Sequence, residues 1–259
     1  MHLKFFLSVC ILFIFSCGGG GGGGSSPTPP PPVPTVNLSA EPTSVLLQNM
    51  STLTWSSTNA SSCSASWTSS TGSSGSQALT ISSVGNNSFS ITCSGAGGSG
   101  SASVSVEGYR NIDGVVVDGY ITGAEICIDE DDNWACDTNE NSTASDNDGK
   151  FTIKYTNGNL VSIGGTDLDS QILLDNLLIT HKLTGHSDFK AITPVTSVAA
   201  FMTNSSAVNG ALGVEPSIDI FTFDPVANKG DGSINDYLYE KGNQLTVLAY
   251  TLQNITNNL

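Results

Sequence analysis

Short stretches in which apolar residues alternate with serine or threonine are the feature that most constrains how this chain folds. Segments rich in Gly, Asn and Ser separate them and supply the residues that turns prefer. A period of two along the chain is the pattern of strands that bury one face. The five stretches lie at residues 36–38, 51–55, 77–81, 88–93 and 102–106. They predict a small β-sandwich over residues 36–106.

Several motifs in this segment can be compared with known families. They are LSA at residues 38–40, PTSV at 42–45, STLTWSSTNA at 51–60, Cys63, and FSITCSGAGGS at 89–99. With these motifs the segment resembles bacterial immunoglobulin-like domains. The resemblance implies a disulfide between Cys63 and Cys93, with Trp55 packed in the core. We expect Trp67 to be a second core residue, and the alternative is an exposed ring that stacks on a sugar.

The N-terminus has the form of an export signal. Lys4 precedes an apolar run of 11 residues, 5–15, whereas a helix needs about 20 residues to cross a bilayer. A run of this length fits the core of a signal peptide. It ends in Ile14-Phe15-Ser16-Cys17, which resembles the lipobox of bacterial lipoproteins. We therefore expect residues 1–16 to be removed as a signal peptide.

The lipobox resemblance implies that Cys17 carries diacylglycerol on its thiol and an acyl chain such as palmitate on its amine. Several acyl chains on one residue give stable anchoring, so the membrane is an expected partner. In that family an Asp at the position of Gly18 tends to retain the protein in the inner membrane. Gly18 thus favours an outer membrane lipoprotein of a Gram-negative cell, facing the periplasm or the cell surface. The alternative is an ordinary secretory signal.

A tether follows the lipidated cysteine over residues 17–35. An unbroken glycine run comes first and a proline-rich stretch second, so a floppy coil leads into a semi-rigid polyproline spacer. Fully extended, residues 18–35 reach roughly 60 Å. The tether is expected to hold the folded part clear of the membrane.

The acidic residues are concentrated in one part of the chain. The net charge is −15, and 12 of the 23 acids lie within residues 107–148, where Arg110 is the sole base. Inside this window, residues 129–140 place oxygen atoms at positions 1, 3, 5, 7, 9 and 12 of an EF-hand calcium loop. The expected ligands are Asp129, Asp131, Asn133, the carbonyl of Ala135, Asp137 and Glu140. Carboxylates this close repel one another without a cation, so the spacing predicts a structural calcium site.

Two features depart from a standard EF-hand. Trp134 occupies position 6, where glycine normally takes a positive φ, and a bulky residue there costs on the order of 1–3 kcal/mol. We therefore expect the turn to follow a different path or to bind calcium more weakly. The flanking residues 115–121 and 124–128 have the pattern of strands, not helices. The alternative is a solvated acidic turn without a metal.

Further motifs surround the loop, namely DGYITGA at residues 118–124 and SDNDGKFT at residues 145–152. Together with the cysteine-flanked acidic loop, they are similar to prealbumin-like β-sandwiches of the Cna-B, SdrD-B and carboxypeptidase-regulatory types, common in bacterial surface proteins. The resemblance implies a calcium-stiffened spacer module, which we place at residues 107–191. We expect a plain hairpin turn at residues 146–151, and the alternative is that its acids add to the metal site.

The cysteines fit this arrangement. Of six, one leaves with the signal peptide and one is lipidated, so four remain and allow three pairings. The local choice pairs Cys63 with Cys93 and Cys127 with Cys136, which gives each module its own crosslink. The alternative is a metal site at Cys127 and Cys136. It is weak because no histidine is nearby and an exported thiol pair would oxidise.

We expect residues 192–259 to form a helical region. Thr193-Pro194 has the form of a helix cap followed by proline at the first helical position, and Asp224-Pro225 repeats it. From Ser233 onward, leucine and isoleucine recur at helical spacing. These residues are Leu238, Leu245, Leu248, Leu252, Ile255 and Leu259. We expect this stripe to pack as core against the preceding helices, and a partner helix is the alternative.

Several functional classes are disfavoured. Only 8 residues are Lys or Arg, too few for a nucleic acid as partner. His181 and His186 lack the spacing of a metalloprotease, and no G-x-S-x-G elbow occurs, so we expect no enzyme.

The sequence therefore predicts a mainly β protein: an immunoglobulin-like sandwich, a prealbumin-like β module and a C-terminal helical region. As function we expect a lipid-anchored cell-surface structural or adhesive protein with a calcium-stabilised β module, and a surface protein or glycan as ligand. One alternative is a surface glycan-binding module with Trp67 and Trp134 as platforms. Another is an accessory subunit of an exported hydrolase or secretion system.

Overall fold

The computed structural model describes residues 28–174, 178–181, 191–202, 205–227, 230 and 232–257. The expected signal peptide, Cys17 and most of the tether lie outside the described residues. The structure is mainly β with a C-terminal helical region, which confirms the predicted fold class. None of its helices combines the length and the apolar character needed to cross a membrane.

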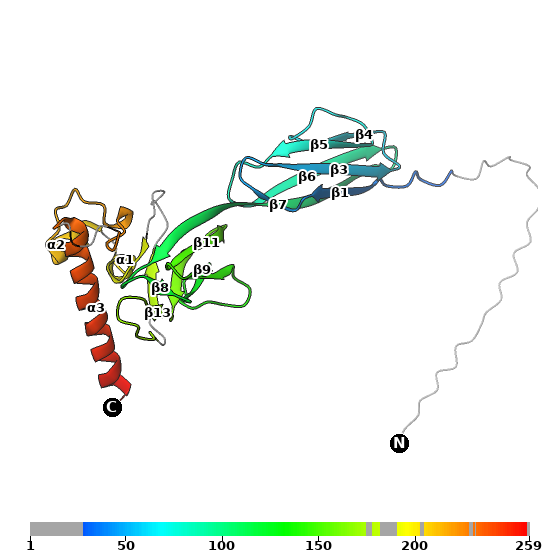
Figure 1. The fold of residues 1–259 in the computed structure, drawn as a ribbon. Helices are drawn as coiled ribbons and strands as arrows, with labels where there is room; N and C mark the ends of the chain where they lie inside the picture. The colour runs from blue at the N-terminus through cyan, green and yellow to red at the C-terminus, as the bar shows by residue number, and fades with distance from the viewer. Residues whose placement is uncertain are drawn as a thin grey trace, which may run out of the picture.

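The first module is a sandwich of two sheets (Figure 1). Its strands are β1 (Thr35–Glu41), β2 (Ser44–Leu46), β3 (Met50–Thr58), β4 (Ser62–Ser64), β5 (Ser74–Thr80), β6 (Gly85–Gly95) and β7 (Gly98–Val116). One sheet has the order β1-β3-β5, and in the other β7, β6 and β4 are neighbours. The alternation of the sequence places every second side chain of β3 in the core, as its burial pattern shows. Both tryptophans pack there: the rings of Trp55 and Trp67 meet edge to face with centroids 5.6 Å apart.

The long strand β7 belongs to both modules. Its first part pairs with β6 of the first sandwich, and its last part, from Arg110 to Val115, pairs with β11 (Lys150–Tyr155). At the crossover, Lys154 of β11 forms an ion pair with Glu107 of β7. The same Glu107 accepts a hydrogen bond of 2.7 Å from the Ser44 hydroxyl of β2. A shared strand and a polar clamp therefore connect the two modules.

The second module packs its sheets around an aliphatic core. Its further strands are β8 (Ile121–Thr122), β9 (Glu125–Asp129), β10 (Ser142–Ala144), β12 (Asn159–Ile163), β13 (Thr166–Asp167), β14 (Leu178–His181) and β15 (Ala191–Ile192). One sheet has the order β10-β9-β12-β14, while β11 and β15 flank β7 in the other. The central strand β9 is buried from Ile126 through Asp129. This burial brings the first residue of the acidic loop to the edge of the core.

The helical region contains α1 (Pro194–Ala200), α2 (Ser205–Leu212), the 3-10 helix η1 (Ile220–Thr222) and α3 (Ile234–Asn257). Thr193 caps α1 with a capping box and Pro194 is its first residue, as predicted. The second predicted helix start, at Asp224, is wrong. The Asp224 carboxylate accepts hydrogen bonds from the N–H groups of Val226 and Ala227, but a turn follows. Gly230 lies close behind with a φ of 96°, which a right-handed helix cannot contain.

The apolar stripe of α3 is only partly core. Leu238 is buried and Leu245 packs against the same cluster of α1, α2 and η1. Leu248 is 53% exposed, so the predicted core position is wrong there. The cause is length, because the 24 residues of α3 extend past the 7 residues of α1. The side chains of Leu252, Ile255 and Leu259 lie outside the described part.

Candidate metal centre

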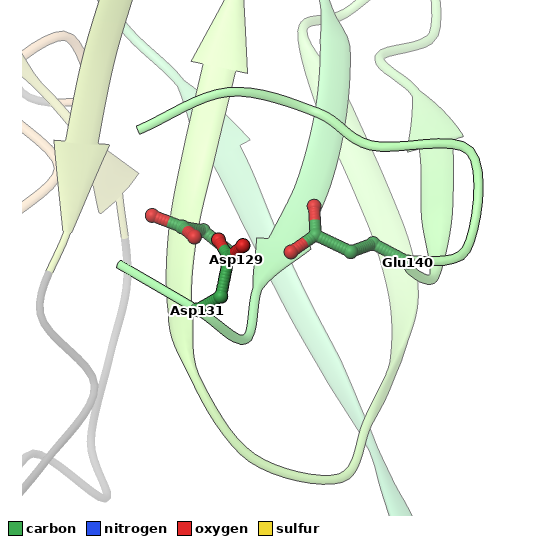
Figure 2. A group of neighbouring side chains, drawn as sticks. All are labelled: Asp129, Asp131 and Glu140. Carbon is green, nitrogen blue, oxygen red and sulfur yellow. The ribbon is translucent and has the colours of Figure 1, made fainter. Parts of the chain in front are cut away.

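Three carboxylates of the acidic loop converge beside the end of strand β9. Asp129, Asp131 and Glu140 each offer an oxygen, and these oxygens all lie within 4.8 Å of one another (Figure 2). Asp129 is buried, Asp131 is exposed and Glu140 is half-buried. Ligand oxygens around calcium lie at 2.3–2.6 Å from the ion, so two of them on opposite sides are about 5 Å apart. The spacing of the three carboxylates fits that span.

Backbone N–H groups hold the two end residues of the loop in place. The Asp129 carboxylate accepts from the N–H groups of Asn133, at 3.1 Å, and Trp134, at 2.9 Å. The Glu140 carboxylate accepts from the N–H groups of Glu130, at 2.8 Å, and Asp137, at 3.0 Å. Each carboxylate therefore binds two backbone N–H groups of the loop. As a result, positions 1 and 12, which are far apart in the loop, face the same point.

The other three predicted ligands have different partners. The Asn133 side-chain amide donates to Asp137 Oδ2 at 2.8 Å and to Asp131 Oδ2 at 3.2 Å. Asp137 is therefore turned to Asn133 and stands outside the converging group. The carbonyl oxygen of Ala135 lies 3.6 Å from the Cys127 sulfur. The Asn133 amide hydrogens offset part of the negative charge that a bound cation would otherwise neutralise.

Two further acids, at positions 2 and 4, fasten the loop to the rest of the module, which the sequence did not indicate. The Thr156 hydroxyl donates to Glu130 at 2.8 Å, and the Asn159 amide donates to Asp132 at 2.6 Å. Asn159 belongs to β12, where it is paired with Asp129 across the sheet. Positions 1, 3 and 12 thus face the centre of the loop, while positions 2 and 4 bind the neighbouring strand and turn.

Trp134 takes the backbone conformation that glycine normally supplies. Its φ is 62°, so the tryptophan itself adopts the left-handed conformation at this position. Weaker calcium binding stays a prediction. The physical reason for the conformation is the surroundings of Trp134. Its N–H is bonded to Asp129, and its ring lies against Phe201 with centroids 4.6 Å apart. Because Phe201 follows α1, this contact also connects the loop to the helical region.

Both predicted disulfides are present, and they connect different kinds of element. Cys63–Cys93 links β4 to β6, which are neighbours in one sheet. Cys127–Cys136 links the buried strand β9 to the acidic loop. The second bond therefore limits how far the loop can open.

The nearby acidic turn does not join the centre. Asp146 accepts hydrogen bonds of 2.8 Å from the N–H groups of both Asp148 and Lys150, and Gly149 has a φ of 74°. These are the features of the plain hairpin turn that the sequence indicated.

The two proposed sugar platforms both contact another aromatic ring, Trp67 that of Trp55 and Trp134 that of Phe201. Both indoles are half-buried.

Comparisons with protein-family models, curated proteins and solved structures found no match to this chain. What the site can do chemically therefore follows from its own residues. A cluster of oxygen ligands, rich in carboxylates and without sulfur or imidazole, is suited to a hard cation.

Proposed function

We propose that this protein is a lipid-anchored cell-surface structural protein whose second β module is stabilised by calcium. The observation that carries the proposal is the convergence of Asp129, Asp131 and Glu140 in a loop whose spacing is that of a calcium loop. Cys17 would hold the chain to the outer membrane, and residues 17–35 would act as the tether.

Charge favours a divalent cation in the loop. Six of the twelve residues 129–140 are Asp or Glu, and none is Lys or Arg. Bringing these carboxylates together costs free energy that a bound cation offsets. Calcium suits the loop better than magnesium does, because calcium tolerates irregular geometry and up to eight oxygen ligands.

A spacer role is supported by the junction of the modules. Strand β7 runs through both, and Lys154, Glu107 and Ser44 connect their strands. The ribbon shows the first sandwich, the second module and the helices following one another along the molecule (Figure 1). Such a chain separates its helical region from the lipid anchor.

Calcium binding is tested on the full exported chain with both disulfides formed. Thermal unfolding is compared in EDTA and in calcium. A calcium concentration 100 times the dissociation constant adds about 2.7 kcal/mol to the stability of the module. We expect a higher midpoint in calcium for the natural chain, and a much smaller shift for Asp131→Asn. Asp131 is chosen because it is exposed, so its neutralisation leaves the core intact.

Asp148→Asn is the matched control, because Asp148 is an exposed acid in the hairpin turn outside the centre. It should respond to calcium as the natural chain does. Identical midpoints in EDTA and in millimolar calcium would remove the calcium part of the proposal.

The anchor is tested separately by mass spectrometry of the mature N-terminus. We expect the mass of a triacylated Cys17, and release of Cys17→Ser from the membrane fraction. A free Cys17 thiol, or a mature start elsewhere, contradicts the lipid anchor and leaves the calcium result untouched.

A further inference from the structure

An acidic residue is buried where the helical region meets the second β module. Asp118 lies in the tight turn after β7, between the bridged residues Val117 and Tyr120, and is only 9% exposed. It borders a small cavity of about 10 Å³. The residues that close this cavity from the helical side are Thr193, Pro194, Pro225, Leu238, Tyr239 and Gly242. The start of α1 and the first half of α3 therefore cover the carboxyl group.

The Asp118 carboxyl group is poorly compensated in this position. Its Oδ1 atom is buried and has no hydrogen-bond partner, and the buried Thr246 hydroxyl of α3 has none either. The Thr246 hydroxyl is close enough to favour the charged form of Asp118, but the two atoms do not form a hydrogen bond of good geometry. A charged carboxylate here would be desolvated, and its Oδ1 atom would have no hydrogen-bond partner, which is costly.

The neighbouring charged groups do not stabilise the ionised form of Asp118. Asp167 of β13 adds a second negative charge, and nearby Tyr239 of α3 donates its hydroxyl to Asp169 at 3.0 Å. On the other side, Tyr120 donates to Asp224 at 3.1 Å. The side chains at the start of α1, Thr193 and Pro194, carry no charge.

The basic residues that the structure describes, Arg110, Lys150, Lys154 and Lys241, contact other groups. Lys241, the single basic residue of α3, lies over the Tyr237 ring and donates to Gln244. The lysines of the β module pair with Asp148 and Glu107. Within the described ranges, no ion pair reaches Asp118. Burial is the main cause that raises the pKa of Asp118 from 3.8 to about 7, and Asp167 raises it further while Thr246 opposes the shift.

We propose that Asp118 is a pH-sensitive clasp, which holds helix α3 against the second β module while its carboxyl group is protonated and loosens that contact when the group ionises. The clasp stands on the geometry of the junction: a buried, unpartnered carboxyl oxygen, a cavity beside it, and a helix that covers both.

The sign of the pH dependence follows from linkage. Once α3 has moved away, Asp118 is in water and its pKa returns to the ordinary 3.8, whereas in the docked state it is about 7. Between these values the docked state binds a proton that the undocked state does not. Docking therefore weakens as the pH rises from about 4 to about 7, by up to about tenfold per pH unit, and becomes constant above about pH 7.

The experiment is hydrogen–deuterium exchange of the full exported chain in EDTA between pH 4.5 and 8, with each rate divided by its intrinsic rate at the same pH. We expect the protection of α3 to fall at least tenfold between pH 4.5 and 7.5, while strand β6 of the first module stays protected. In Asp118→Asn the protection of α3 should be independent of pH. Asp113→Asn, an exposed acid on the same strand β7, should keep the natural profile.

Thr246→Val keeps the proposal testable if Asp118→Asn fails to dock its helix at any pH. Removing the hydroxyl that favours the ionised carboxylate should move the transition to higher pH. The clasp is overturned if protection of α3 in the natural chain does not change with pH, if Asp118→Asn keeps the natural profile, or if Thr246→Val leaves the midpoint in place.

Discussion

The two β modules contain one disulfide each and are otherwise stabilised in different ways. The first has a single acid, Glu41, within residues 36–106, and its disulfide lies among buried neighbours such as Trp55 and Ile91. The second contains most of the acids, and its disulfide joins a buried strand to an exposed loop. Core packing stabilises the first module. The second module is also destabilised by repulsion between its closely spaced carboxylates. The comparison separates stability that a cation affects from stability that it does not.

Removing the central side chain of the first module should have the largest effect. Trp55 is buried, its indole N–H donates to the Gly72 carbonyl at 3.0 Å, and its ring lies against Trp67. We expect Trp55→Ala to cost about 3–5 kcal/mol. Denaturant unfolding should show loss of the first module, while the calcium response of the second remains. Thr54→Ala, exposed on the same strand, is the control.

Loss of the calcium response in Trp55→Ala would contradict this separation of the two modules. The two modules would then unfold as one cooperative unit through the shared strand β7.

Removing either disulfide should have a smaller effect, and the effect should differ between the two modules. The chain-entropy model gives about 3–4 kcal/mol for Cys63–Cys93, which closes a sequence separation of 30, and about 2–3 kcal/mol for Cys127–Cys136, with a separation of 9. Each pair is replaced by alanines and unfolding is followed in EDTA and in calcium. We expect the first pair to lower stability equally in both solutions. The second should also weaken calcium binding, because the loop opens further.

An equal loss of calcium affinity in both double variants would contradict this assignment. It would mean that the effect of a crosslink on the loop does not depend on where the crosslink lies.

How much of this could be predicted differs between local and long-range features. The alternation of apolar and polar residues located the strands, because it records which face is buried. The spacing of the acids correctly predicted that Asp129, Asp131 and Glu140 lie together. The sequence pattern could not show that β7 continues from one module into the next. That continuity depends on the partner strands β6 and β11, which are distant in the sequence. The same limit applies to Asp118. Nothing in its own neighbourhood of sequence indicates that α3 covers it.

The smallest predicted effect concerns the one position where the loop departs from the calcium-loop pattern. Trp134 combines a strained φ of 62° with a ring contact to Phe201, so replacing it changes two quantities at once. Two variants separate them. Trp134→Ala loses the ring and keeps the strain, whereas Trp134→Gly loses the ring and relieves the strain. The glycine variant should therefore be more stable than the alanine variant by about 1 kcal/mol.

Denaturant unfolding of the second module measures this difference, and Phe201→Ala gives the cost of the ring contact alone. Elsewhere in a folded chain glycine is the less stable of the two, because it loses more conformational freedom on folding. If the glycine variant is the more stable of the two, the difference reports the backbone strain of the turn itself. If alanine were equal to or better than glycine, the left-handed turn at Trp134 would not be imposed by the loop. The acids at both ends of the loop would then converge only with that indole in place, a dependence that the first module, held by its packed core and its disulfide, does not have.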